Sequence, residues 1–277
     1  GKPQRAFQLH MAELRENPSS IDTLLECGGL LITMHRPLEA IEKFRRVLEV
    51  EPAHVEAHWR IAQASLDMEN FDQARVGFEV VRRLEPDAPL VRRRLAESLL
   101  GCNRPVEARK ELIEAFDRVA EDEPIKELER LAELMLSVDM LKEAKQLLEQ
   151  ALPRAESSPA IIRMLAACRF RTGDLSGGSL LSRRVLRLEP NCVRSMHNLA
   201  FSALEEDRLI SATRWVNRGL RVDPHDAGLR RVRSRVWARI FWLWTLGLPT
   251  ATRALIAKTY TRCIRKTTTV NDDGGMS

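Results

Sequence analysis

The residue types that could bind a metal are scattered along the chain. Of its six histidines, only His54 and His58 lie one helical turn apart, and no acidic ligand pattern accompanies them. A protein zinc site normally draws three or four ligands from closely grouped His, Cys or carboxylate side chains. The sequence therefore predicts surface histidines and no metal site.

The cysteines and carboxylates give no catalytic pattern either. The five cysteines form no CxxC pair, and an odd, scattered set is typical of reduced thiols in a cytoplasmic compartment. The chain has no Gly-rich phosphate loop, HExxH or GxSxG motif. Adjacent carboxylates such as Glu205 and Glu206 are expected to be solvated. We predict a non-enzymatic protein with no catalytic residue and no cofactor.

Composition favours a packed soluble protein with a basic end. The 277 residues are 44% hydrophobic and 30% charged, too polar for a polytopic membrane protein. The net charge is +5, but residues 226–277 hold ten Lys or Arg against three Asp and so carry +7. The rest of the chain is therefore slightly acidic, and the basic excess belongs to the C-terminal segment.

Small residues recur at a fixed interval and mark an internal repeat. The interval is 34 residues, with one of 36, along the series Ala6, Ala40, Ala74, Ala108, Ala144, Gly178 and Ala212. Twelve positions earlier runs a second series, Gly28, Ala62, Ala96, Ala132, Ala166 and Ala200. Apolar residues at i, i+3, i+4 and i+7 predict two amphipathic helices per unit. Small residues at these positions let the two helices approach closely.

This pattern resembles the tetratricopeptide repeat family, whose 34-residue unit has small residues at these positions and Pro near its end. Residues 21–226 divide into six such repeats, 21–54, 55–88, 89–124, 125–158, 159–192 and 193–226, with a two-residue insertion near 120–124. Residues 1–20 are expected to be the second helix of a truncated repeat. The resemblance implies an all-α, right-handed α-solenoid with a C-terminal capping helix. It also implies a scaffold or adaptor that binds a partner peptide or helix in a concave groove.

The family's register places certain positions of each first helix in that groove. The groove-facing residues expected here are Trp59, Arg60, Gln63, Arg93, Arg94, Glu97, Arg130, Arg163, Arg194, His197, Asn198, Phe201, Arg231 and Arg235. Guanidinium groups bind carboxylates bidentately, which favours a partly acidic partner. The alternative is that these arginines pair with Glu97, Glu129 and Glu133 and only keep the groove soluble. The sequence leaves both interpretations open.

The C-terminal region differs in kind. Gly247 and Pro249 divide residues 227–266 into a capping helix and a second, aromatic and basic helix, and residues 267–277 are expected to be a disordered tail. Val232, Val236, Ile240 and Leu243 form a stripe that could cover the last repeat. Residues 240–252 contain no charge, so one repeat cannot hide them all. The remaining residues predict a second surface, made of Trp237, Arg239, Phe241, Trp242, Trp244, Arg253, Lys258 and Tyr260.

This second surface has three possible uses. It could contact a partner protein or a second copy of the chain. It could also attach the protein peripherally to a membrane, with Trp and Tyr at headgroup depth. Nucleic acid is the least favoured partner, because the basic residues match no known binding motif. Arg239 and Arg253 leave only thirteen residues between them, too few to span a bilayer.

Overall fold

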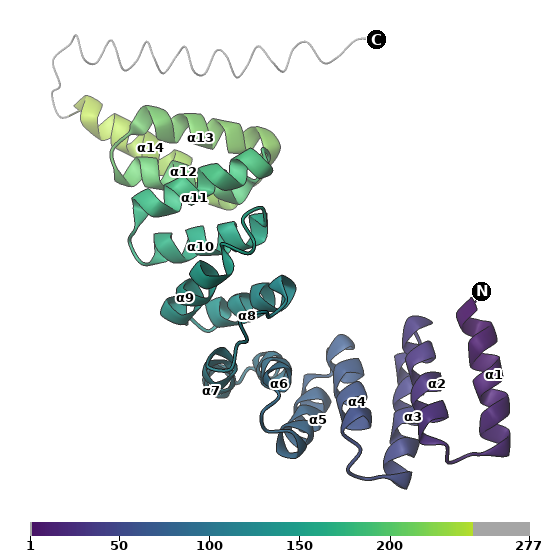
Figure 1. Ribbon diagram of the computed structural model, residues 1–277. Helices are drawn as coiled ribbons and strands as arrows, with labels where there is room; N and C mark the ends of the chain where they lie inside the picture. The colour runs from purple at the N-terminus through teal and green to yellow at the C-terminus, as the bar shows by residue number, and fades with distance from the viewer. Residues whose placement is uncertain (1, 246–277) are drawn as a thin grey trace, which may run out of the picture. The chain divides into compact units, whose positions relative to one another are not determined.

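The computed structural model describes residues 2–245, apart from the side chains of Lys2, Pro89, Trp244 and Thr245. Over this range the chain forms fourteen α-helices and no β-strand (Figure 1). The helices are α1 (Lys2–Glu16), α2 (Ile21–Thr33), α3 (Pro37–Val50), α4 (Val55–Asp67), α5 (Phe71–Leu84), α6 (Pro89–Gly101), α7 (Pro105–Phe116), α8 (Ile125–Ser137), α9 (Leu141–Ala151), α10 (Pro159–Arg171), α11 (Leu175–Leu188), α12 (Val193–Glu205), α13 (Leu209–Val222) and α14 (Ala227–Thr245). The predicted all-α repeat solenoid is confirmed.

The helices form two compact units. Unit 1 is Gly1–Glu143 and unit 2 is Ala144–Ser277. In unit 1, α2 packs with α3, α4 with α5 and α6 with α7, and α3 and α5 each contact the helix that follows. In unit 2, α10 packs with α11, α12 packs with α13, and α14 lies against both α12 and α13 (Figure 1). Each helix pair therefore buries its apolar side against its neighbours, as in other helical-repeat proteins.

Side-chain size explains how the two helices of a pair approach each other. In α3, Pro37 occupies the first turn, where its missing N–H costs no hydrogen bond. Ala40 and Phe44 follow one turn apart on the buried side of this helix. A Cβ atom added at Gly28 of α2 would overlap the ring of Phe44. Glycine at this position therefore lets the phenyl ring lie directly against the α2 backbone.

A left-handed residue ends the first helix of each pair. Its φ lies between 53° and 64° at His35, Glu69, Asn103, Asp139 and Asp207, and is 84° at Gly173. These positions follow one another at intervals of 34 residues, with one of 36 between Asn103 and Asp139. After α12, the amide of Asp207 donates to Leu204 O and that of Arg208 to Ala203 O, at 3.0 and 2.7 Å. This is the Schellman pattern, which satisfies the last helical carbonyls and turns the chain sharply.

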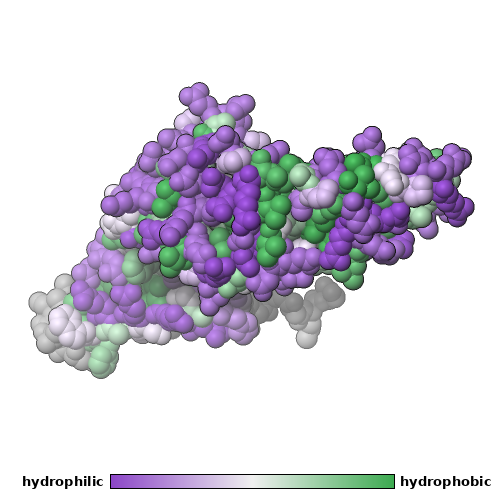
Figure 2. All heavy atoms as spheres, turned by 90° about the horizontal axis from the view of Figure 1, so that it is seen from below, coloured by the Kyte–Doolittle hydropathy of each residue, from purple (hydrophilic) through white to green (hydrophobic). Residues whose placement is uncertain are grey.

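The last helix closes the core of unit 2. Leu229, Val232 and Val236 of α14 are buried against α12 and α13, and Ile240 is partly buried beside them. Their spacing of three and four residues places them along one side of the helix. Elsewhere the surface is mainly hydrophilic, with apolar side chains in scattered patches on the face that Figure 2 shows. Within residues 2–245, no helix is both long enough and apolar enough to cross a lipid bilayer.

Candidate functional site

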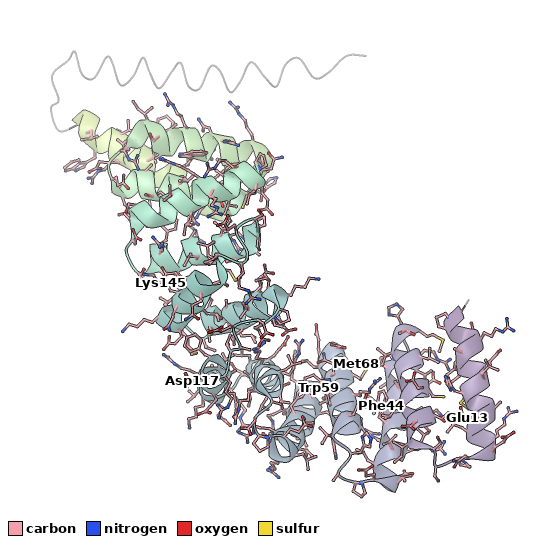
Figure 3. All side chains as sticks on the ribbon, viewed as in Figure 1. Glu13, Phe44, Trp59, Met68, Asp117 and Lys145 are labelled. Carbon is pink, nitrogen blue, oxygen red and sulfur yellow. The ribbon has the colours of Figure 1, made fainter. Side chains whose placement is uncertain are left out.

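The expected groove residues of α4 make contacts within unit 1. Trp59, which Figure 3 labels on α4, packs edge-on against Phe78, with 5.2 Å between ring centroids. Arg60 forms an ion pair with Glu56 at 2.6 Å, and Gln63 donates a hydrogen bond to a carboxylate one turn further along the helix. All three side chains are partly buried. The Arg60 guanidinium and the Gln63 amide are thus paired with carboxylates of their own helix.

Arg93 departs from its expected place in the groove. Its side chain is buried, with only 1% of the residue exposed, and is the largest of the fully buried side chains. Its Nη1 atom lies 2.7 Å from Glu123 and 3.7 Å from Glu127. Glu123 belongs to the connection between α7 and α8, which holds the two-residue insertion. The insertion supplies the carboxylate that lets this arginine be buried, so Arg93 is not available to a partner.

The other two arginines expected in the groove of unit 1, Arg94 and Arg130, are also paired with carboxylates. Arg94 pairs with Glu97 at 3.1 Å and lies 3.8 Å from Glu127. Arg130 pairs with both Glu97 and Glu133, and the hydrogen bond to Glu97 raises the pKa of its guanidinium. In unit 1 the arginines of the first helices are thus paired with glutamates. This is the arrangement expected under the alternative interpretation, in which the charges only keep the groove soluble.

Unit 2 presents a different arrangement on α12 and α14. Arg194 and Arg231 are exposed and form no ion pair with the residues that the structure describes. His197 and Asn198 are half-buried in the same stretch of α12. A Cβ atom at Gly228 would lie 3.0 Å from His197 Cδ2, so glycine lets the start of α14 pass close to α12. The first helix α12 and the capping helix α14 therefore lie close enough for their side chains to form one surface.

Arg235 continues this surface along α14. Its guanidinium lies 5.8 Å from the centroid of the Phe201 ring and pairs with Glu205 at 2.8 Å, while its side chain stays 56% exposed. Arg163 of α10 pairs with Glu189 at 3.3 Å and is less available. We call the joint surface the α12–α14 face, which consists of Arg194, His197, Asn198, Phe201, Arg231 and Arg235.

A pocket adjoins this face and had no counterpart among the sequence predictions. It has a volume of about 420 Å³ and is lined by Leu204, Glu205, Asp207, Arg235, Ala238, Arg239 and Trp242. Arg239 donates two hydrogen bonds to Asp207, at 2.9 and 3.1 Å, and lies over the Trp242 ring at 5.8 Å. We call this site the α14 pocket. The one sequence signal for this pocket was Asp207, a carboxylate at a turn position that favours glycine.

The expected second surface is divided between two sides of α14. Arg239 and Trp242 line the pocket, whereas Trp237 and Phe241 lie on another side, because successive helical residues are rotated by about 100°. Trp237 is 45% and Phe241 65% exposed. The Trp244 side chain, Arg253, Lys258 and Tyr260 lie outside the described part of the chain, so their predicted role stays a prediction.

Charge separates the two units more sharply than the sequence analysis indicated. Residues 1–143 hold 21 Lys or Arg against 28 Asp or Glu, a net charge of −7. Residues 144–245 hold 18 basic and nine acidic residues, a net charge of +9. The α12–α14 face therefore lies on a unit with a positive electrostatic potential.

Other reactive groups are buried or dispersed. Cys27 and Cys168 are buried, and desolvation raises the pKa of the Cys168 thiol to about 11. At neutral pH that thiol is protonated and a poor nucleophile. The described side chains include no group of His, Cys, Asp and Glu that could hold a metal ion.

Five packed helix pairs, α2–α3, α4–α5, α6–α7, α10–α11 and α12–α13, define a helical-repeat protein within residues 2–245. Its exposed side chains define a basic face on the neighbouring helices α12 and α14. A family model described as tetratricopeptide repeat matches residues 31–92. The match shows tetratricopeptide repeat sequence over residues 31–92, and the helix pairs of the described chain share the fold of solved tetratricopeptide repeat proteins. No protein of curated function matches it by sequence.

Solved structures share the fold at low sequence identity. The C-terminal part of a tetratricopeptide repeat protein from Cytophaga hutchinsonii is 15% identical, with a TM-score of 0.60 over 90% of this chain and 98% of that one. PilW, a type IV pilus biogenesis factor, is 14% identical, with a TM-score of 0.59 over 76% and 97%. YrrB, described as having an unusual peptide-binding site, is 14% identical, with a TM-score of 0.58 over 68% and 96%. These likenesses concern the fold alone.

Proposed function

We propose that this protein is a non-enzymatic adaptor that binds an acidic peptide segment of a partner protein on the α12–α14 face. The tetratricopeptide fold indicates a protein–protein interaction scaffold. The observation that carries the finer proposal is a contrast between arginines. Arg93, Arg94 and Arg130 are paired with glutamates within unit 1. Arg194 and Arg231 are exposed and form no ion pair with any described residue.

The side chains of the face suit different parts of such a peptide. Arg194 and Arg231 can each take a carboxylate in a bidentate pair, which is stronger than a neutral hydrogen bond. The Asn198 side chain has both a donor and an acceptor and can therefore hold a peptide backbone in an extended conformation. Phe201 offers apolar contact area. Arg235 already holds Glu205, so we expect it to position the peptide rather than supply a free charge.

The α14 pocket leads us to expect one apolar residue in the bound peptide. Leu204, Ala238 and the Trp242 ring give the pocket an apolar lining, and Arg235 is shared between the pocket and the face. A peptide that lies across both would place carboxylates beside Arg194 and Arg231 and an apolar side chain in the pocket. YrrB is a precedent for peptide binding by a protein of this fold.

A peptide array tests this proposal. The array varies net charge and apolar content at constant length, and binding is measured for the full chain and two variants of equal net charge. The test variant is Arg194→Glu with Arg231→Glu. The control is Arg187→Glu with Arg214→Glu, two exposed arginines on the second helices α11 and α13. We expect acidic peptides with an apolar residue to bind best, and the test variant to lose about tenfold in affinity per ion pair removed.

The control variant decides between a specific face and general attraction. It should keep most of the affinity, because its arginines lie away from the α12–α14 face. Equal losses in both variants would show that the basic charge of unit 2 attracts peptides without a defined site. That outcome would contradict the proposal.

Attachment to a membrane surface is the second candidate function. The exposure of Trp237 and Phe241 favours it, since aromatic side chains near basic residues are common at lipid headgroups. The engagement of Arg239 by Asp207 weighs against it, because that guanidinium is already held by a carboxylate. Flotation with phosphatidylserine-containing vesicles tests this alternative: it predicts that the full chain floats and that a Trp237→Ser, Phe241→Ser variant does not, and it is contradicted if the full chain stays with the soluble fraction.

A further inference from the structure

Two second helices of unit 2, α11 and α13, carry basic side chains and no acidic ones. Their six arginines are Arg183, Arg184, Arg187, Arg214, Arg218 and Arg221. Neither helix contains Asp, Glu or Lys. The second helices of unit 1 differ, since α3, α5 and α7 each mix acidic with basic residues. Helices α11 and α13 therefore contribute +6 of the +9 charge that residues 144–245 carry.

These arginines lie on the outer side of their helices. The buried residues of α13 lie on one side of the helix, which packs against α12 and α14 (Figure 1). Because a helix turns by about 100° per residue, Arg214, Arg218 and Arg221 fall nearly opposite this buried side. In α11, Leu180 and Arg187 fall opposite the buried side in the same way. The outer sides of α11 and α13 are therefore separate from the α12–α14 face.

Two of the six arginines hold the backbone, and the other four are uncommitted. Arg184 and Arg218 each donate a hydrogen bond to a backbone carbonyl 28 residues earlier, at 2.7 and 2.9 Å. The other four are exposed and form no hydrogen bond or ion pair with the residues that the structure describes: Arg183, Arg187, Arg214 and Arg221. Their charges are therefore available to a partner of opposite charge.

An exposed aliphatic side chain accompanies the arginines on each helix. Leu180 of α11 is 66% exposed, and Ile210 of α13 is 51% exposed. Each lies one helical turn before an uncommitted arginine, on the outer side of its helix. The outer arginine surface is the name we give to this set: Leu180, Arg183, Arg187, Ile210, Arg214 and Arg221.

We propose that the outer arginine surface binds the anionic headgroups of a lipid bilayer. Its basic residues are all arginines, whose planar guanidinium groups bind phosphate through two hydrogen bonds. Clustered basic residues are attracted to the negative surface of anionic membranes. The aliphatic stem of arginine lies along apolar surface while its charged head stays in water. Leu180 and Ile210 then enter the boundary between headgroups and acyl chains, as the apolar residues of peripheral helices do.

The aliphatic side chains favour lipid over nucleic acid as the partner. Proteins that bind single strands without sequence preference combine a basic groove with aromatic side chains on which bases stack. Trp215 is the one aromatic residue of α11 and α13, and it is half-buried, with the Arg218 guanidinium 5.6 Å from its ring centroid. A nucleic acid would therefore use the arginines and leave Leu180 and Ile210 in water.

This inference does not depend on the peptide proposal, because it uses other arginines on other helices. The second candidate function also involves a membrane, but it assigns the contact to Trp237 and Phe241 of α14. The two membrane hypotheses therefore differ in which substitutions should abolish binding.

Sedimentation with vesicles tests the proposal on the full chain. The vesicles are phosphatidylcholine with and without phosphatidylserine, at about 0.1 M salt. The test variant is Arg187→Glu with Arg214→Glu, and the control of equal net charge is Arg194→Glu with Arg231→Glu. Each arginine beside an anionic surface strengthens binding about fivefold, so the test variant should bind about 25-fold more weakly or worse. The control should lose less than about threefold, because distant charges are screened beyond about 10 Å at this salt.

A third variant, Leu180→Ser with Ile210→Ser, tests the assignment to lipid at constant charge. We expect it to bind phosphatidylserine vesicles at least about fivefold more weakly, because two exposed aliphatic side chains no longer enter the bilayer boundary. Unchanged binding would mean attraction by charge alone and would overturn the assignment to lipid. Circular dichroism first establishes that all variants have the helicity of the parent chain.

Three further outcomes would overturn the proposal. The first is a full chain that does not sediment with phosphatidylserine vesicles, and the second is an equal loss of binding in the two arginine variants. The third is a loss confined to the Trp237→Ser, Phe241→Ser variant, which would place the membrane contact on α14. The arginine variants exchange their roles in the peptide array, so this proposal and the peptide proposal can fail independently of each other.

Discussion

Arg93 and Arg231 hold the same position in their helices, the fifth residue of α6 and of α14, but they have opposite environments. Arg93 is buried between Glu123 and Glu127, whereas Arg231 is exposed and makes no ion pair within residues 2–245. The difference comes from the neighbouring carboxylates and not from the arginine itself. At the residue scale, the partner available to a charge decides whether it stabilises the fold or remains free to bind.

The first prediction concerns the buried arginine. A Glu123→Gln, Glu127→Gln variant leaves Arg93 buried without a carboxylate, and we expect a loss of about 3 kcal/mol in the free energy of unfolding. Adding Arg93→Met should restore most of it, because a buried ion pair can be replaced by apolar groups at little cost. Urea unfolding followed by circular dichroism measures both values. A double Gln variant as stable as the parent would show that the Arg93 charge is solvated.

The sequence could not place Arg93 correctly, and the reason is physical. The direction of a side chain at the fifth helical position follows from the helix register, and the register alone points it to the groove. Its burial depends on Glu123, which belongs to an irregular connection. Such a connection has no periodic signal. The α14 pocket escaped prediction for a similar reason, since the pairing of Arg239 with Asp207 needs a turn residue whose side chain reaches the next helix pair.

At the element scale, small residues set the distance between paired helices. The 34-residue series of Gly and Ala was readable because the size of a side chain is a property of the residue alone. That series predicted the all-α solenoid, and the structure confirms it. In α2 the contact is closest at Gly28, where the ring of Phe44 takes the space of a Cβ atom. A Cβ atom at the neighbouring Gly29 would meet only the flexible tip of Arg60, at 3.1 Å.

These two glycines give a matched pair of substitutions for the second prediction. We expect Gly28→Ala to lower the free energy of unfolding by about 1–3 kcal/mol, because the Phe44 ring is buried and must shift. Gly29→Ala should be neutral or slightly stabilising, since alanine favours the helix and Arg60 can move. Thermal unfolding of both variants measures the difference. Equal effects at the two positions would contradict the close approach of α2 and α3.

At the scale of the whole molecule, stability is expected to be local. Each helix pair contacts the next along the chain within its unit, so the loss of one element should weaken its neighbours most. The helix α14 covers α12 and α13, and its Leu229, Val232 and Val236 are buried there.

The third prediction follows from this arrangement. Deleting residues 227–277 should raise amide hydrogen exchange in α12 and α13 by about tenfold or more, because their apolar side becomes exposed, and should leave α2–α5 nearly unchanged. A deletion of residues 267–277 alone is the control and should change neither region. Mass spectrometry of exchanged peptides reads out each helix separately. A uniform rise across both units would show that the chain unfolds as one cooperative body.

The left-handed residue that ends each first helix also matters to anyone who wishes to engineer a more stable scaffold. A non-glycine residue in this conformation costs about 1 kcal/mol, so glycine at Glu69 or Asn103 would recover part of that strain. The same exchange at Asp207 would remove the carboxylate that holds Arg239 beside the pocket. A stabilised version of this protein should therefore keep its strained turn at Asp207, because there the conformational cost maintains the pairing that lines the α14 pocket.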